Sequence, residues 1–157
     1  MIQRIQTVWL FLAGLCVFLM FLFPYLQYFD LEGVAKVLKV TGLLQNVDGQ
    51  IVQTEAFYLQ TVVTVILGLF SFYIVFCFRN RKTQLKLIRI NILLLLGFIA
   101  WLFWIGRTQT LALDKGLDLG NMGVGFFLPL IAIIFLILAA RGVRRDEQLV
   151  RSADRLR

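Results

Sequence analysis

Apolar residues are gathered into four long stretches that contain no Asp, Glu, Lys or Arg. These stretches are residues 8–26, 56–78, 90–106 and 122–140. A helix needs roughly 20 apolar residues to cross a hydrocarbon core of about 30 Å. The third stretch is shorter, but it can extend through Arg89, whose long side chain can reach the headgroups. The pattern predicts four transmembrane helices within one integral membrane domain, residues 1–157.

Composition points the same way and narrows the available chemistry. The chain has 157 residues, 60% of them hydrophobic and 16% charged, whereas soluble domains have about 45–50% apolar and about 25% charged residues. There is no histidine, and Cys16 and Cys77 both lie inside apolar stretches. We therefore expect no catalytic residue, no metal site, no cofactor and no disulfide framework.

The distribution of positive charge predicts the orientation. Twelve of the 16 Lys and Arg residues lie in the segments that share a side with the two termini, which are residues 1–7, 79–89 and 141–157. Positive loops stay in the cytoplasm, so both termini should be cytoplasmic and residues 27–55 and 107–121 should form outer loops. An anionic inner leaflet accounts for the basic charge, and no nucleic-acid partner is expected.

The first outer loop contains a pattern typical of strands. Residues Lys36–Gln45 and Gln50–Thr54 are rich in β-branched and apolar side chains and flank Asp48-Gly49, a common hairpin turn. Residues Thr108–Leu113 could add a third strand. A flexible loop is the alternative, because an isolated hairpin is marginally stable. The predicted fold class is an all-α membrane protein, a four-helix transmembrane bundle with a small extracytoplasmic β-hairpin or three-stranded sheet.

The second apolar stretch carries one stripe of small and polar residues. At 100° per residue these fall on one side of the helix, and they are Gln60, Thr61, Thr64, Gly68 and Ser71. Small residues allow helices to approach closely, so we expect this face to pack against another helix. The alternative is the lining of a substrate path, which is disfavoured because no ionisable residue lies at membrane depth.

The cytoplasmic segments carry a candidate contact surface for a partner or for lipid. Its basic residues are Arg79, Arg81, Lys82, Lys86, Arg144, Arg145, Arg151, Arg155 and Arg157. The tail, residues 141–157, is predicted to be helical because its apolar residues cluster on one side and Glu147 precedes Arg151 by four positions. Such a tail either lies on anionic headgroups or docks another membrane or cytoplasmic protein.

Four polar segments resemble a known family. They are Met1-Ile-Gln-Arg-Ile-Gln-Thr7, the closing residues 146–157, Asn80-Arg-Lys82 and Arg89-Ile-Asn-Ile-Leu93. They resemble a family of small, four-span inner-membrane proteins of Bacteroidota that is described as a domain of unknown function. The resemblance covers the whole chain. The resemblance implies this architecture and a place in the bacterial inner (cytoplasmic) membrane, and it supplies no substrate, cofactor or catalytic residue.

Three classes of function remain. The favoured hypothesis is a non-catalytic accessory or scaffold subunit that docks a partner through the basic loop and tail. The alternative is a small transporter or channel subunit for neutral or lipidic cargo, based on the polar stripe and Asn91. A membrane enzyme would have to use outer-loop carboxylates that lack partner spacing, such as Asp30, Glu32, Asp114 and Asp118. The sequence does not indicate an oligomeric state.

Overall fold

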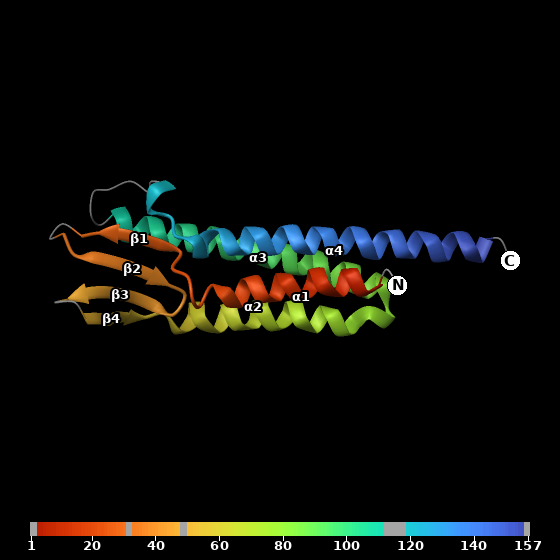
Figure 1. Ribbon diagram of the computed structural model, residues 1–157, viewed down its shortest axis with the longest axis horizontal. Coiled ribbons are helices and arrows are strands. Elements are labelled where there is room, and N and C mark those ends of the chain that lie inside the picture. Colours follow the sequence, from red (N-terminus) through yellow and green to blue (C-terminus); the bar gives the residue numbers. More distant parts are fainter. Residues whose placement is uncertain (1–2, 31–32, 48–49, 112–118, 156–157) are drawn as a thin grey trace.

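Four α-helices and one small sheet make up most of the part of the chain that the structure describes. The computed structural model describes residues 3–30, 33–47, 50–111 and 119–155. The helices are α1 (Gln3–Leu19), α2 (Tyr58–Phe76), α3 (Arg81–Leu111) and α4 (Val124–Arg155). The strands are β1 (Leu26–Phe29), β2 (Ala35–Lys39), β3 (Gly42–Val47) and β4 (Gln50–Ala56). The helices lie side by side in a bundle, with the sheet at one end and both termini at the other (Figure 1).

Three of the helices, α2, α3 and α4, are long and apolar enough to span a membrane. This indicates a membrane protein. The first helix is apolar but shorter than the predicted span of residues 8–26, because regular α-helix ends at Leu19. The next turns are tighter, with the N–H of Phe21 donating to the carbonyl of Phe18. Pro24 then stops the helix, because it has no N–H and favours extended backbone at the residue before it.

The sheet has four antiparallel strands in the order β1-β2-β3-β4, so the predicted hairpin or three-stranded sheet is one strand or more too small. β3 and β4 pair on either side of Asp48-Gly49, as predicted, although these two residues lie outside the described part of the chain. The predicted strand Lys36–Gln45 is in fact β2 and β3, separated by a turn at Val40–Thr41. Gly42 permits this turn because its φ is +152° and a Cβ there would lie 2.0 Å from the Glu55 carbonyl oxygen.

The predicted third strand, Thr108–Leu113, is wrong where the structure describes it. Residues 108–111 continue α3, and the last two lie outside the described residues. Thr108 and Thr110 donate hydrogen bonds to the helix carbonyls of Ile105 and Gly106, respectively, which satisfies their hydroxyls within the helix. A period-two pattern over a few residues therefore did not outweigh continuation of a long apolar helix.

The helices start and connect through local polar contacts. The backbone N–H of Thr83 donates to Oδ1 of Asn80, which caps the start of α3. Gln84 on α3 donates to the carbonyl of Ile74, one of the last carbonyls of α2. Thr61 in the first turn of α2 donates to the Val40 carbonyl, 3.0 Å away, and so joins the helix to the sheet. The sheet is thus fixed on the ends of the helices.

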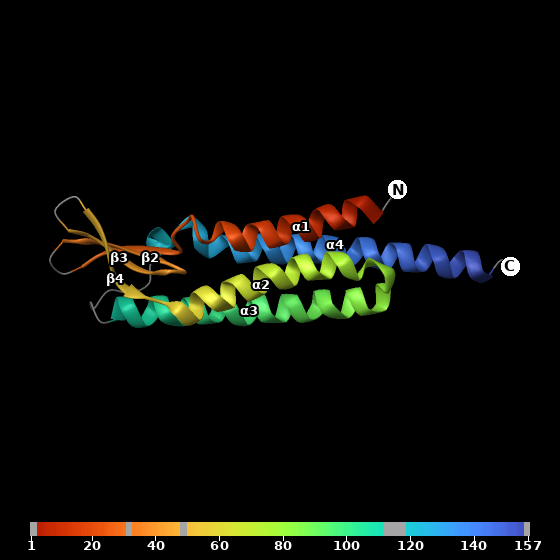
Figure 2. The same ribbon diagram turned by 90° about the horizontal axis from the view of Figure 1, so that it is seen from below.

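The last helix is longer than the bundle. α4 is continuous through Gly142 to Arg155 and extends past the start of α1 and past the connection between α2 and α3 (Figures 1 and 2). The core runs along the bundle, where α1 packs mainly on α4 and α2. It ends under the sheet, where Tyr25, Leu38 and Val40 are buried.

Candidate functional site

The small and polar stripe of α2 faces the interior of the bundle. Gln60, Thr64, Gly68 and Ser71 are buried and Thr61 is half-buried. A Cβ at Gly68 would lie 2.5 Å from the ring of Phe18 on α1, and one at Gly14 on α1 would lie 3.0 Å from the ring of Phe72 on α2. A phenylalanine of each helix therefore packs against a glycine of the other helix. The two phenylalanine rings stack on each other with their centroids 5.8 Å apart.

The other side of the stripe bonds to α3. Nδ2 of Asn91 donates to Oγ of Ser71 over 2.8 Å, and both side chains are fully buried. Ser71 in turn donates to the Leu67 carbonyl of its own helix. Within the described part of the chain, Oδ1 of Asn91 has no hydrogen-bond partner. The spacing of small residues predicted a packed face, but it could not name the partner helix or this bond.

Gln60 begins the stripe at the sheet end of the bundle. Its side chain is 1% exposed, and neither Oε1 nor Nε2 has a hydrogen-bond partner among the described residues. The hydroxyl of Tyr25, in the connection between α1 and β1, also lacks one. The Gln60 side chain lies near this hydroxyl. Two polar groups thus lie close together in an apolar setting, outside hydrogen-bond geometry.

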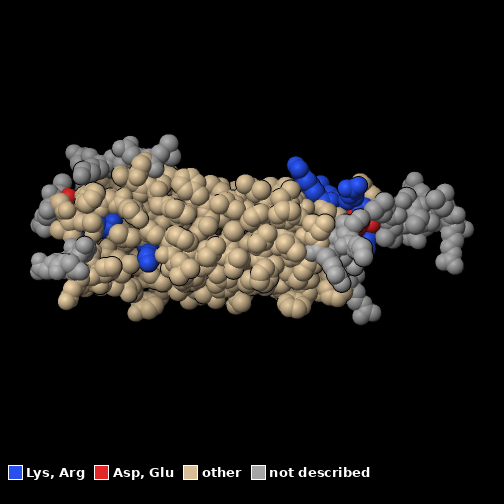
Figure 3. Space-filling view, viewed as in Figure 1, with Lys and Arg blue, Asp and Glu red and all other residues tan. Residues whose placement is uncertain are grey.

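The predicted basic contact surface lies at the end of the bundle that carries both termini. In Figure 3 Lys and Arg gather near that end, while the middle of the visible face shows no charged residue. Lys82, Lys86, Arg144 and Arg145 are exposed. Arg81 is half-buried instead, because its guanidinium donates to the Asp146 carbonyl over 2.8 Å. The remaining predicted members, Arg79, Arg151, Arg155 and Arg157, have side chains outside the described set.

Asp146 is an acidic residue of the tail for which the sequence indicated a part in docking and no structural role. It is 7% exposed, and its carboxylate accepts a hydrogen bond from Nε2 of Gln6, itself buried on α1. One turn earlier, Gly142 lets the two helices approach, since a Cβ there would lie 2.7 Å from Cγ of Gln6. The four-residue spacing of Gly142 and Asp146 places them on one face of α4 and was the available signal.

The comparisons with known proteins give one match. A family model described as "Domain of unknown function (DUF4293)" matches residues 2–156. The chain belongs to the DUF4293 family. Neither the curated proteins nor the solved structures contain a match to it.

Asp30 is the one outer-loop carboxylate of the four named above that lies in the described part of this DUF4293 chain. Asp30 forms an ion pair with Lys36 across the turn between β1 and β2. Glu32, Asp114 and Asp118 lie outside the described residues. Within the described ranges, no group of three or more Cys, Asp or Glu residues could hold a metal ion. The arrangements that stand out are therefore the packed α1–α2 face, the basic end and the unpaired Gln60.

Proposed function

We propose that this protein is a four-span protein of the bacterial inner membrane with both termini in the cytoplasm. In this proposal it acts as a non-catalytic accessory or scaffold subunit. It docks another membrane or cytoplasmic protein through the basic loop between α2 and α3 and through the end of α4. The anionic inner leaflet holds the same basic residues near the membrane surface.

The length of the first helix supports four spans. Its 17 residues of α-helix cover about 26 Å at about 1.5 Å per residue. The tight turns that continue it as far as Phe23 add to this length, which brings it near the core thickness of about 30 Å. Reporter fusions test the orientation. Alkaline phosphatase should be active after Thr54 and inactive after Lys82 or Arg157. Activity at Arg157 would contradict the proposed four spans with a cytoplasmic C-terminus.

The observation that carries the docking proposal is the projection of α4 beyond the other helices (Figure 2). The contacts of Asp146 with Gln6 and Arg81 fix the base of this projection to α1 and to the start of α3. Arg144 and Arg145 are exposed beside that base. A rigidly held helix that displays charges of both signs can select a partner by charge pattern as well as by attraction.

The transport alternative receives less support from the polar stripe. Phe18 fills the space beside Gly68, and Asn91 bonds to Ser71, so this face of α2 is used in packing. A path along it would require the helices to separate.

Site-specific photocrosslinking tests docking in cells that contain the full-length chain. A photoreactive amino acid at Arg144 or at Gln148, both exposed, should give a discrete crosslinked protein. The same group at Ile131, an exposed apolar position on α4, is the matched control for contacts with lipid or with passing membrane proteins.

Charge reversal then separates docking from attraction to headgroups. The change Glu147→Lys adds positive charge, so it should strengthen membrane contact but weaken a specific protein contact. Docking predicts that the crosslinked protein disappears in Glu147→Lys and after truncation at Gln148. If the crosslinked species persist in both variants, or if they are the same as at Ile131, the docking proposal is wrong.

A further inference from the structure

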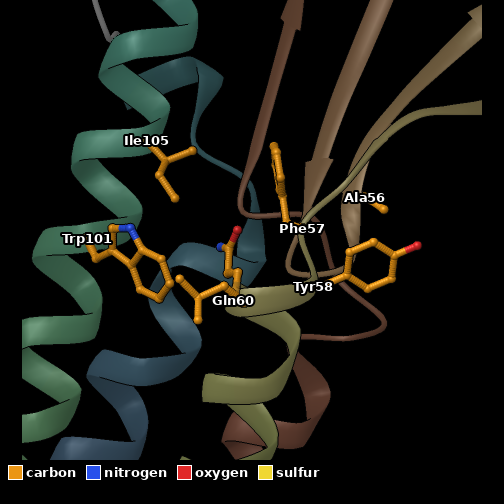
Figure 4. A pocket seen from close by; sticks show the side chains of 7 residues that line it. Ala56, Phe57, Tyr58, Gln60, Trp101 and Ile105 are labelled. Atoms are coloured by element: carbon orange, nitrogen blue, oxygen red, sulfur yellow. The ribbon is translucent and has the colours of Figure 1, made fainter.

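A pocket of about 350 Å³ lies where the sheet meets the helices. Its wall consists of residues 56–60, at the junction of β4 and α2, and of Trp101 and Ile105 on α3. In Figure 4 Gln60 lies between the two α3 side chains and Phe57. None of the lining residues is charged. Its size is at the lower end of the range of about 300–1,000 Å³ for small-molecule sites.

The unusual member of this wall is Gln60. A buried amide without hydrogen bonds is costly, and almost all buried polar side chains have a partner. Gln60 has one unpaired donor group and one unpaired acceptor, and it is 1% exposed. The unpaired Tyr25 hydroxyl near it adds a further polar group in the same region. An incoming molecule can therefore gain hydrogen bonds here.

The chemistry of the wall restricts that molecule. An uncharged lining disfavours a phosphate or carboxylate in the pocket, because burying an unpaired charge is costly. A primary amide can bond at the same time to an acceptor and to a donor of one ligand. A glycerol ester with a free hydroxyl on the carbon next to the esterified carbon offers both. The apolar side chains around it then suit a hydrocarbon chain.

The position of the pocket indicates where the molecule comes from. Trp101, Tyr58 and Phe57 surround it near one end of the helices, and Tyr58 and Leu59 at its rim are 79% and 68% exposed. Aromatic side chains concentrate at the level of the headgroups and the glycerol backbone in membranes. An exposed apolar rim at this level faces lipid in the membrane orientation proposed above.

We propose that this pocket binds a neutral glycerolipid of the diacylglycerol or monoacylglycerol class, with its ester carbonyl accepting from Nε2 of Gln60 and its free hydroxyl donating to Oε1. The acyl chain lies along Trp101 and Ile105. The site is at the sheet end of the bundle and its existence does not depend on docking at the basic end.

A binding assay with the purified full-length protein in detergent tests the site. Radiolabelled dioleoylglycerol is the probe, and unlabelled dioleoylglycerol and dioleoylphosphatidylcholine are the competitors. The two competitors share their acyl chains, but only the first has a free hydroxyl. We expect dioleoylglycerol to compete at least about ten-fold better, because phosphatidylcholine leaves Oε1 unpaired. This competition assay uses the unchanged protein and requires no mutation.

Two variants locate the binding. Gln60→Leu removes the amide and should weaken dioleoylglycerol binding about ten-fold without lowering Tm, because it also removes unpaired buried groups. Ile105→Trp should abolish binding by filling the pocket. Leu94→Trp, at a 49% exposed position of α3 outside the pocket, is the matched control and should bind as the unchanged protein does.

Equal competition by the two lipids would show that acyl chains bind without recognition of the head, and this would overturn the proposal. Wild-type affinity in Gln60→Leu or in Ile105→Trp would overturn it as well. Absence of any saturable binding to the unchanged protein would have the same consequence. None of these outcomes affects the photocrosslinking test of docking, so the two proposals fail separately.

Discussion

Phe18 of α1 lies against Gly68 of α2 so closely that a Cβ at the glycine would be 2.5 Å from the ring. The converse contact, Phe72 over Gly14, lies beside it on the same two helices. Between helices in lipid the main attraction is close packing, since lipid tails are as apolar as the side chains. This reciprocal pair is therefore a principal reason why α1, the shortest of the four helices, is held in the bundle.

Added bulk at Gly68 should destabilise the protein. We expect Gly68→Leu to lower the free energy of unfolding by about 1–3 kcal/mol, because the Phe18 ring must move out of its site. Ile66→Leu, at a 57% exposed position of the same helix, is the control and should have little effect. Thermal unfolding in detergent measures the difference. Similar Tm values for the two variants would mean that the α1–α2 contact is not as close as described.

The bond between Asn91 and Ser71 should make a measurable contribution. Interhelical hydrogen bonds in membrane proteins contribute about 0.6 kcal/mol on average and at most about 1.7 kcal/mol. A double-mutant cycle of Ser71→Ala and Asn91→Leu should give a coupling energy in this range. The cycle separates the bond from the effect of removing the unpaired Oδ1 of Asn91, which the single variant cannot do. Additive effects within about 0.3–0.5 kcal/mol would exclude the bond.

Asp146 should contribute more to the stability of the fold than its neighbour Glu147. Asp146→Ala leaves the buried Gln6 amide without its acceptor, so we expect a loss of about 1–3 kcal/mol. Glu147→Ala, one residue on and half-buried, should cost much less. Denaturation in detergent provides the comparison. Equal losses would indicate that the Gln6 contact adds nothing, and experiments on partner binding must in any case leave Asp146 intact.

Much of the fold follows from the hydrophobic pattern. A membrane helix requires a long apolar segment, and soluble proteins rarely contain such a segment. The second, third and fourth stretches contain the apolar parts of α2, α3 and α4. The ends of the helices were harder to predict. Residues of α3 before Ile90 and of α4 after Ala140 are polar and helical, since outside the bilayer a helix can continue on local propensity and capping alone, as at Asn80.

The errors have a common physical cause in long-range contacts. The division of Lys36–Gln45 into two strands depends on Gly42, whose backbone lies against Glu55 of β4, thirteen positions further on. Asp146 appeared as one charge among many in the tail because its partner, Gln6, is at the other end of the chain. A pattern within one segment carries no information about such partners. For the same reason the stripe on α2 predicted packing but not Phe18 or Asn91.

The start of α4 supplies the last prediction, because Gly123 lies directly against the corner between α1 and β1. Its N–H donates to the Tyr25 carbonyl over 3.0 Å, and a Cβ there would lie 2.2 Å from the Pro24 carbonyl oxygen. The obstructing atom is backbone, so it cannot rotate away as a side chain would. Gly123→Ala should therefore separate α4 from the corner and cost about 1–3 kcal/mol.

Gly120→Ala is the matched control, since a Cβ at Gly120 meets no atom of the described residues within 4 Å. Hydrogen exchange in detergent is the direct measurement. In Gly123→Ala the amides of residue 123 and of β1 should exchange faster, because the bond to Tyr25 and the adjoining bridge between Leu26 and Met122 are strained together. Amides in the middle of α2 should keep their wild-type protection. Faster exchange throughout the bundle would instead mean that this corner supports the whole fold, and wild-type exchange at residue 123 would refute the close approach.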